Sequence, residues 1–209
     1  MNLIEETPFR WRIDPVGQMR VPGMVFASRS LLPDVISDRS LGQVANVATL
    51  LLDLLTPVEE LDRANVFDIE LLASRLTAAT TWLGGRPDAA SCRVGYFGAS
   101  TGAGAALRAA AAPGAQIAAV VSRGGRPDLA GPRLGEVRAP TLLIVGSADR
   151  AVLELNRQAQ AQLRCPSELA VVAGATHLFE EPGTLAEAAL LARDWFARHL
   201  LPADPARPV

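Results

Sequence analysis

Apolar runs and amphipathic stretches alternate along the chain from about residue 22 to its end. Each apolar run has four to eight residues and shows no regular polar alternation. Such runs are typical of strands that are covered on both faces, as in a parallel sheet. The runs predict strands at residues 23–27, 47–54, 93–97, 117–122, 141–145 and 169–172.

The stretches between these runs are amphipathic and predict helices. Residues 68–83 carry Ile69, Leu72 and Leu76 at helical spacing, and Asp68 is a candidate N-cap. Further helices are expected at residues 103–110, 152–163 and 183–200. Strands that alternate with helices over this length predict a three-layer α/β/α sandwich around a mostly parallel sheet.

The length of the chain favours a single domain over residues 1–209. Within the first 22 residues, the polarity of residues 9–13 alternates, which is compatible with an antiparallel edge strand before a turn near Pro15. Residues 56–65 have the composition of a loop. The proline-rich stretch at residues 202–209 is expected to be a loose tail.

Composition argues against several partners and locations. The net charge is −2 and all 20 basic residues are arginine, a balance that favours neither nucleic acid nor an anionic membrane. No apolar stretch reaches the roughly 18 residues that span a bilayer, and the acidic first residues are unlike a signal peptide. Cys92 and Cys165 lack a CxxC spacing, which indicates free thiols in a reducing compartment. We therefore expect a cytoplasmic protein, and a homodimer is compatible with the sequence.

The stretch Gly98-Ala99-Ser100-Thr101-Gly102 lies between an apolar run and an alanine-rich helical pattern. A G-x-S-x-G string between a strand and a helix is typical of a nucleophile elbow, which lifts a serine hydroxyl above a sheet. The small residues Gly98 and Gly102 leave room for the strained backbone of such a turn. Ser100 is therefore the candidate nucleophile.

A nucleophilic serine needs a histidine to take its proton and a carboxylate to orient that histidine. The chain contains two histidines. His199 lies near the end of the last helical pattern, where a cationic side chain suits the helix dipole, whereas His177 follows the last predicted strand. Asp149 follows the strand at residues 141–145. Ser100, Asp149 and His177 thus follow three strands in the order that α/β-hydrolases use.

Other chemistries find little support in the sequence. The chain holds neither a G-x-G-x-x-G dinucleotide fingerprint nor a G-K-[ST] phosphate loop. Two histidines without clustered cysteines offer little for a metal site. We expect no cofactor and no metal.

Longer stretches match one known family, at residues 50–56, 67–69, 95–102, 122–130, 139–146 and 174–183. On these stretches the chain resembles, from about Thr49 to Leu200, a dienelactone-hydrolase-like branch of the α/β-hydrolase superfamily, some members of which are fused to a phosphoribosyltransferase domain. The resemblance implies a small α/β-hydrolase fold with few lid insertions. It also implies Ser100 as nucleophile, Asp149 as acid and His177 as base. Dienelactone hydrolases proper use a cysteine nucleophile, so the serine argues against that exact substrate.

One loop departs from the pattern of the family. Such hydrolases usually carry a His-Gly-containing loop after the third strand, and its backbone donates one oxyanion hydrogen bond. Residues 28–33 here read Ser-Arg-Ser-Leu-Leu-Pro, without His or Gly. The N–H of Thr101 can supply one donor, and the second would come from Ser28 or Arg29. Loss of one such donor costs on the order of 10²–10³ in rate.

Arg123 and Arg126 follow the predicted strand at residues 117–122 and are candidate substrate-binding residues. A guanidinium can hold a substrate carboxylate through a bidentate fork. The alternative is structural, with both arginines bound to Asp128 or to nearby backbone carbonyls.

Together these residues predict a serine hydrolase that cleaves an ester, thioester or lactone of a small molecule through an acyl-enzyme on Ser100. Residues 56–66 are the best candidate for a small lid. Two alternatives stay open: a non-catalytic or weakly active binding module whose altered loop at residues 28–33 leaves the triad idle, and an acyltransferase that passes the acyl group to an alcohol. The sequence decides neither the natural substrate nor the oligomeric state.

Overall fold

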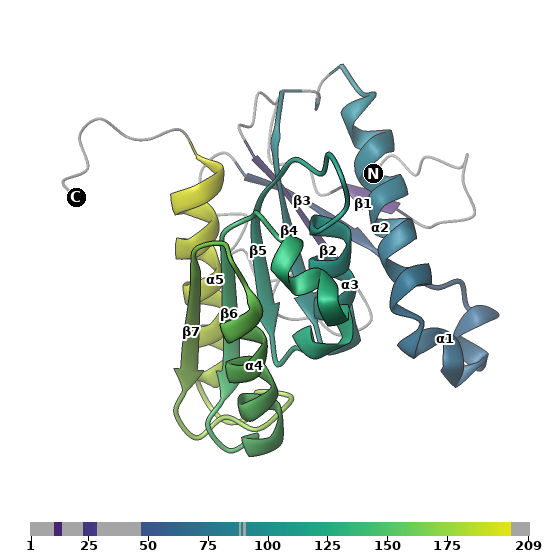
Figure 1. Ribbon diagram of the computed structural model, residues 1–209. Coiled ribbons are helices and arrows are strands. Elements are labelled where there is room, and N and C mark those ends of the chain that lie inside the picture. The colour runs from purple at the N-terminus through teal and green to yellow at the C-terminus, as the bar shows by residue number, and fades with distance from the viewer. Residues whose placement is uncertain (1–10, 14–22, 29–46, 88, 90, 202–209) are drawn as a thin grey trace, which may run out of the picture.

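The computed structural model describes residues 11–13, 23–28, 47–87, 89 and 91–201 (Figure 1). The strands are β1 (Trp11–Ile13), β2 (Gly23–Ser28), β3 (Val47–Leu52), β4 (Arg93–Ala99), β5 (Ile117–Arg123), β6 (Thr141–Gly146) and β7 (Ser167–Val172). The helices are α1 (Arg63–Phe67), α2 (Ile69–Gly84), α3 (Thr101–Ala110), α4 (Arg150–Gln162) and α5 (Thr184–Leu200), with 3-10 helices η2 (Glu59–Leu61) and η3 (Pro127–Glu136). Each predicted strand and helix is present, with described ends within two residues of the predicted ones.

The strands form one sheet in the order β1-β3-β2-β4-β5-β6-β7. β1 runs antiparallel to β3, and the other neighbouring pairs are parallel. The mostly parallel sheet predicted from the sequence is therefore confirmed. The carboxyl ends of parallel strands meet at one edge of a sheet, which we call the carboxyl edge. The arrowheads of β5 and β7 point to this edge, at the bottom of Figure 1.

Part of the prediction for the first 22 residues can be compared with the structure. Trp11–Ile13 forms an antiparallel edge strand, as the alternating polarity predicted. Residues 9–10, the turn near Pro15 and the tail at residues 202–209 lie outside the described residues.

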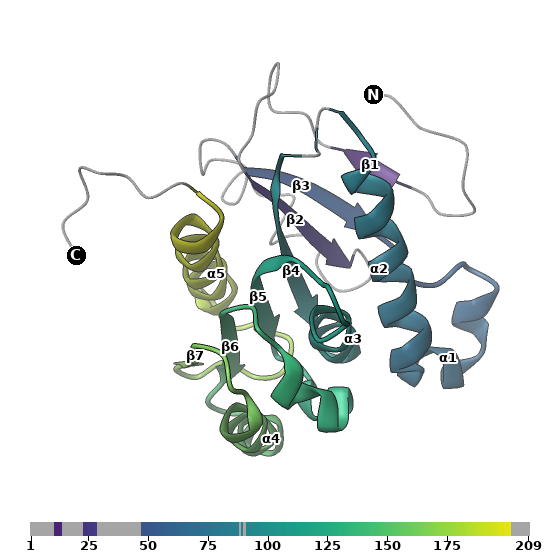
Figure 2. The same cartoon turned by 45° about the horizontal axis from the view of Figure 1, so that its top comes forward.

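Helices cover both faces of the sheet (Figure 2). α5 packs on one face, and α2, α3 and α4 lie on the other. Because neighbouring residues of a strand point to opposite faces, Tyr96 joins the core beneath α2 and α3, whereas Phe97 joins the core beneath α5. The arrangement confirms the three-layer sandwich. Among the helices that the structure describes, none combines the length and the hydrophobicity that crossing a membrane requires.

α3 packs closely against the sheet and against α2, which lies beside it (Figure 2). Its residues Ala103, Ala105 and Ala106 are at most 1% exposed, because only small side chains fit between the two neighbours. A Cβ on Gly104 would lie 3.0 Å from the Cβ of Leu129. The alanine-rich pattern is therefore a packing requirement of the helix that follows Ser100.

Residues 56–67 differ from the predicted loop, because they contain η2 and α1. Thr56 and Glu59 cap each other: the Thr56 N–H donates to Glu59 Oε2 at 2.8 Å, and the Glu59 N–H donates to Thr56 Oγ1 at 3.3 Å. Asp62 then caps α1 by accepting the N–H of Ala64 at 2.9 Å. The T-x-x-E and Asp signals for these short helices are present in the sequence.

Candidate active site

Three loops at the carboxyl edge carry the residues that the sequence singles out. Ser100 follows β4, Asp149 follows β6 and His177 follows β7. Ligands of open α/β sheets bind at this edge, because loops from neighbouring strands converge there. The tertiary structure therefore brings residues 77 positions apart in the chain to one edge of the sheet.

Ser100 occupies the turn between β4 and α3 with φ 49° and ψ −124°. Such a backbone is rare for residues other than glycine and costs about 1–3 kcal/mol, which surrounding contacts must offset. The Ser100 carbonyl accepts the N–H groups of Ala103 at 3.1 Å and of Arg126 at 3.0 Å. A Cβ on Gly98 would lie only 2.4 Å from the carbonyl oxygen of Gly102, so the turn requires glycine there. Strand, strained serine and helix together have the geometry of a nucleophile elbow.

Asp149 and His177 are hydrogen-bonded, with 2.7 Å between Asp149 Oδ2 and His177 Nδ1. Asp149 stands at the N-cap of α4, where aspartate usually accepts a helix N–H, yet its side chain makes no such bond. The carboxylate is turned to the imidazole instead. The Asp149 side chain is 15% exposed and that of His177 is 43% exposed, so the acid is shielded while the histidine stays accessible. A carboxylate on Nδ1 leaves Nε2 for proton exchange with a hydroxyl.

The loops of the acid and the histidine bind each other through their backbones. The Ala148 N–H donates to the Ala175 carbonyl at 3.0 Å, and the Ser147 N–H donates to the Val172 carbonyl at 2.9 Å. A Cβ on Gly146 would lie 2.2 Å from the Ala175 carbonyl oxygen, so this approach requires glycine. Main-chain contacts therefore set the distance between the acid and the histidine.

Glu181 supports the histidine loop from the side of α5. Its Oε2 accepts the Thr176 N–H at 3.0 Å, and its carbonyl accepts the Thr184 hydroxyl at 2.8 Å. The hydrogen bonds with Thr176 lower the pKa of the Glu181 carboxyl, which favours its anionic form. The sequence does not indicate this contact, because the return of the Glu181 carboxylate to the loop depends on the tertiary path of the chain.

The backbone donors expected for an oxyanion lie at the same edge. Thr101 is the first residue of α3, where helix N–H groups have no partner inside the helix. Ser28 is the last residue of β2, next to β4, where Ala27 pairs with Phe97. The backbone of Ser28 thus ends beside the elbow. Residues 29–33, the remainder of that loop, lie outside the described residues.

The two candidate substrate-binding arginines are both engaged with the protein. Arg126 holds Asp128 in a bidentate fork, with Nε 2.8 Å from Oδ1 and Nη2 2.7 Å from Oδ2. Arg123 is 4% exposed, its Nη1 donates to the Leu178 carbonyl at 3.5 Å, and its guanidinium carbon lies 5.2 Å from the ring centre of Phe179. Burial lowers the pKa of Arg123 from its ordinary value. These contacts favour the structural alternative for both arginines.

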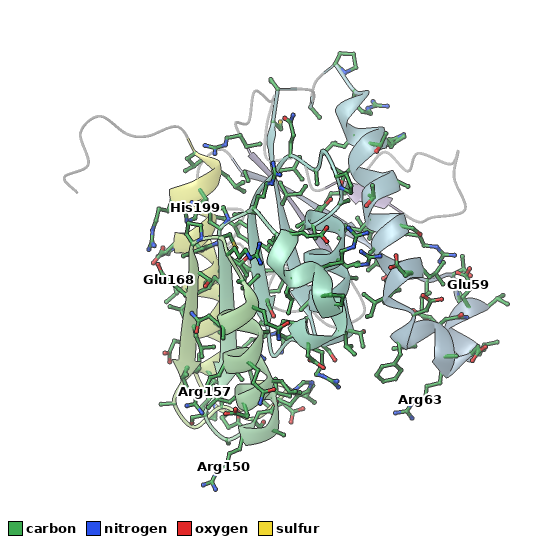
Figure 3. The ribbon with its side chains drawn as sticks, viewed as in Figure 1. Glu59, Arg63, Arg150, Arg157, Glu168 and His199 are labelled. Carbon is green, nitrogen blue, oxygen red and sulfur yellow. The ribbon has the colours of Figure 1, made fainter. Side chains whose placement is uncertain are left out.

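His199 lies near the end of α5, at the opposite end of the molecule from Arg150 at the start of α4 (Figure 3). Its ring centre lies 4.5 Å from that of Trp195. Burial, together with the charge of Arg198, lowers the pKa of His199. The cationic form that suits a helix dipole is therefore disfavoured, because desolvation opposes it. Of the two histidines, His177 is the one at the carboxyl edge.

Sheet order, elbow and converging loops define the chain as an α/β-hydrolase. A solved dienelactone hydrolase from Anabaena variabilis is 46% identical with a TM-score of 0.83, and the match covers 92% of this chain and 93% of that one. The chain therefore belongs to the dienelactone hydrolase family, which confirms the resemblance seen in the sequence. No sequence profile of a known family matches the chain.

More distant solved structures share the fold. Est1E from Butyrivibrio proteoclasticus is 14% identical with a TM-score of 0.73, and the match covers 91% of this chain and 93% of that one. An alpha-beta serine hydrolase homologue from Coxiella burnetii is 17% identical with a TM-score of 0.73, with 92% and 95% covered. At these identities the likeness concerns the fold alone.

Curated relatives are longer than this chain. Two proteins of Mycobacterium tuberculosis, from strains CDC 1551 and H37Rv and each named "Putative phosphoribosyl transferase", are 67% identical over 161 residues. The match covers 77% of this chain and 36% of each relative, so the chain matches about a third of their length. This arrangement is compatible with the fusion to a phosphoribosyltransferase domain that occurs in the branch.

Proposed function

We propose that this chain is a serine hydrolase that cleaves an ester, thioester or lactone of a small molecule through an acyl-enzyme on Ser100. The observation that carries the proposal is the 2.7 Å hydrogen bond between Asp149 and His177, at the same edge as the strained turn of Ser100. Membership of a hydrolase family supports the class of reaction. The mechanism follows from the chemistry of the three side chains.

In the acylation step, His177 Nε2 takes the proton of Ser100 Oγ while that oxygen forms a bond to the carbonyl carbon of the substrate. The π electrons of the carbonyl move to its oxygen, and the N–H of Thr101 stabilises the resulting oxyanion. The second donor is proposed to come from the backbone at Ser28 or Arg29. Collapse of the intermediate breaks the bond to the leaving group, which receives the proton from His177.

In the deacylation step, His177 removes a proton from water, and the oxygen of that water attacks the acyl carbon. The bond between Ser100 Oγ and the acyl group breaks, the serine regains the proton and the free acid is released. Asp149 holds the imidazole tautomer and stabilises the imidazolium in both steps. The cycle needs no cofactor.

Small esters and lactones are the substrates to test first. The Anabaena relative is named a dienelactone hydrolase, which makes lactones a reasonable choice for this chain. The serine in place of the cysteine of dienelactone hydrolases proper argues against the dienelactone itself. We assign the transferase activity that the names of the M. tuberculosis proteins suggest to the part of those proteins that this chain does not match.

A fluorophosphonate probe tests the proposal directly, because it reacts with activated serines. We expect wild-type protein to be labelled on Ser100, with labelling lost in Ser100→Ala and kept in the control Ser74→Ala, which changes a serine on the outer face of α2. On 4-nitrophenyl acetate and small lactones, Ser100→Ala should lose at least about 10⁴-fold in kcat. Folded wild-type protein that is not labelled, or a Ser100→Ala variant as active as wild type, would refute the mechanism.

The same assay separates the two alternative functions. A binding module would show neither labelling nor turnover while keeping its fold. An acyltransferase would give more ester than acid when a small alcohol is added during turnover. Hydrolysis is supported when the free acid remains the main product.

A further inference from the structure

We propose that the turn Arg123–Arg126, between β5 and η3, is a positioning element that sets Ser100 and His177 relative to each other. The proposal rests on the proposed function, because it concerns how the reacting residues of that mechanism are held. The turn contacts the elbow, the histidine loop and the helix that begins after the acid. Each contact can be followed separately.

The first contact is with the elbow. The Arg126 N–H donates to the Ser100 carbonyl at 3.0 Å. A residue with φ 49° keeps that conformation only when its surroundings hold it there. The side chain of Arg126 is bound in turn by Asp128, in a fork of two hydrogen bonds at 2.8 and 2.7 Å. The fork fixes the backbone that supplies the donor.

The second contact is with the histidine loop. Gly124 has φ +52°, and a Cβ there would lie 3.0 Å from the His177 carbonyl oxygen and 3.8 Å from His177 Nδ1. The Gly124 N–H donates to the Ile144 carbonyl at 2.8 Å, which ties the turn to β6. Arg123 adds its bond to the Leu178 carbonyl, one residue beyond the histidine. A glycine is therefore needed where the turn meets the histidine.

The third contact is with α4, the helix that begins after Asp149. Asn156 is fully buried, and its Nδ2 donates to the Gly125 carbonyl at 3.0 Å and to the Val152 carbonyl at 2.8 Å. A Cβ on Gly125 would lie 2.0 Å from Ser122 Oγ, so the second glycine of the turn is also required by close packing. One turn of four residues thus contacts the elbow, the histidine loop and the helix that follows Asp149.

These contacts give the stretch Ser122-Arg123-Gly124-Gly125-Arg126 a role other than binding a substrate carboxylate. A misplacement of about 1 Å in a reacting group costs on the order of 10²-fold in rate. A displacement of a few tenths of an ångström at His177 should therefore lower kcat measurably. Binding of the substrate should change little, because Gly124 itself is not proposed to touch it.

The test compares two glycines that both have a positive φ. Gly131 has φ +57°, close to that of Gly124, but a Cβ there would meet nothing within 4 Å. Both Gly124→Ala and Gly131→Ala place an alanine at positive φ, so both melting temperatures should fall, and that of Gly124→Ala should fall further because its Cβ also meets the His177 carbonyl oxygen. Only Gly124→Ala pushes on the histidine loop. We expect it to lower kcat about tenfold or more with KM within about twofold, while Gly131→Ala keeps the wild-type kcat.

A spectroscopic measurement makes the outcome independent of turnover. In a proton NMR spectrum of the wild-type protein, the proton between His177 Nδ1 and Asp149 should give a low-field resonance. We expect this resonance to shift or broaden in Gly124→Ala but not in Gly131→Ala. If Gly124→Ala does not fold, Asn156→Ala replaces it. Its side chain is buried away from solvent, so a severalfold lower kcat with unchanged KM supports the proposal and an unchanged kcat overturns it.

Failure of this inference differs from failure of the proposed function. Equal kcat values and equal resonances in the two glycine variants would overturn the positioning role, while probe labelling that depends on Ser100 would leave the hydrolase mechanism standing. Turnover that persists in Ser100→Ala would refute the mechanism. The resonance would still report whether the turn holds the histidine loop.

Discussion

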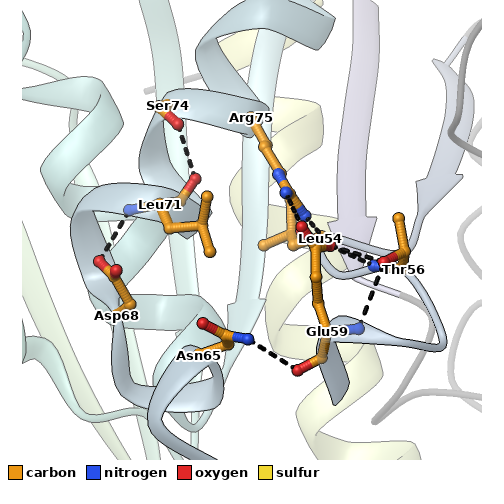
Figure 4. A network of polar contacts seen from close by, with 8 residues as sticks. All are labelled: Leu54, Thr56, Glu59, Asn65, Asp68, Leu71, Ser74 and Arg75. Atoms are coloured by element: carbon orange, nitrogen blue, oxygen red, sulfur yellow. Dashed lines mark hydrogen bonds and ion pairs between the residues drawn. The ribbon is translucent and has the colours of Figure 1, made fainter. Parts of the chain in front are cut away.

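Two parts of the carboxyl edge are held in place by different kinds of contact. The loops of the acid and the histidine bind each other through main-chain hydrogen bonds and close backbone approaches. The outer segment, residues 54–68, is instead held by a cluster of charged and polar side chains (Figure 4). The part of the edge proposed to react is therefore held by backbone contacts, whereas the outer segment is held by charged and polar side chains.

Glu59 is the centre of the charged cluster. Its carboxylate accepts the N–H and the hydroxyl of Thr56, each at 2.8 Å, and binds both terminal nitrogens of Arg75. Arg75 also donates to the Leu54 carbonyl at 2.8 Å, and Asn65 donates to the Glu59 carbonyl at 2.9 Å. The hydrogen bond with Arg75, followed by those with Thr56, lowers the pKa of Glu59 to about 2. The folded outer segment therefore favours the ionised form of the Glu59 carboxyl.

The outer segment also differs in what it exposes. Val58 is 77% and Leu61 86% exposed, whereas in the histidine loop Leu178 is 52% exposed and Ala175 and Phe179 are at most 2% exposed. Exposed apolar side chains beside the carboxyl edge support the proposal that residues 56–66 form a small lid or substrate wall. Substitutions in this segment should affect substrate binding more than chemistry.

The largest expected effect is on kcat/KM, and it distinguishes Asp149, beside the histidine, from Asp62 in the outer segment. Asp149→Asn should lower kcat/KM on the order of 10³–10⁴-fold, because the amide no longer stabilises the imidazolium or its tautomer. Asp62→Asn in the outer segment should keep the wild-type value, since asparagine caps a helix as well as aspartate does. Steady-state hydrolysis of a small ester measures both. An Asp149→Asn variant with more than about a tenth of wild-type activity would break the distinction.

The next effect concerns packing at the elbow. Gly98→Ala should lower the free energy of unfolding by about 3 kcal/mol, because the new Cβ overlaps backbone atoms of the turn that cannot yield cheaply. Gly84→Ala, at the open end of α2, should be neutral or stabilising by about 0.5–1 kcal/mol. Urea denaturation compares the two. If Gly98→Ala and Gly84→Ala have equal free energies of unfolding, the elbow is not held by close packing.

A smaller effect should appear in the pH dependence of stability. The pKa of Glu59 is lowered in the folded protein, so its contribution is complete above the unfolded value of 4.5 and is lost as the pH falls towards about 2. The difference in melting temperature between wild type and Glu59→Gln should therefore be present at pH 7 and shrink between pH 4.5 and 2. Glu60→Gln, an exposed neighbour, is the control. A difference that stays constant over this range contradicts the charge dependence.

The smallest effect tests the proposed lid. Leu61→Ser should change stability by no more than about 0.5 kcal/mol, because the side chain is 86% exposed. We expect kcat to stay unchanged and KM to rise for esters with longer acyl chains. Leu190→Ser on α5, 45% exposed and away from this segment, should leave KM as it is. If both variants have the same KM on a long-chain ester, the outer segment does not contribute to the substrate site.

Much of the site could be predicted because its residues follow strands. Ser100, Asp149 and His177 each follow an apolar run, and parallel strands bring such positions to one edge. The short helices at residues 59–67 could also have been predicted, since Thr56 and Glu59 have the spacing of a capping box. Apolar periodicity does not indicate them, because η2 has three residues and α1 five, too few to show a repeat.

The succession of strands and helices along the chain, and the edge at which Ser100, Asp149 and His177 fall, follow from the sequence alone, because apolar periodicity and turn residues act locally. The turning of the Asp149 carboxylate from the start of α4 to His177 depends on the tertiary structure. The tertiary structure also decided which glycines the fold requires: Gly124 and Gly146 each meet a backbone from a distant part of the chain. Contacts of this kind depend on distances between loops, which no pattern along the chain encodes.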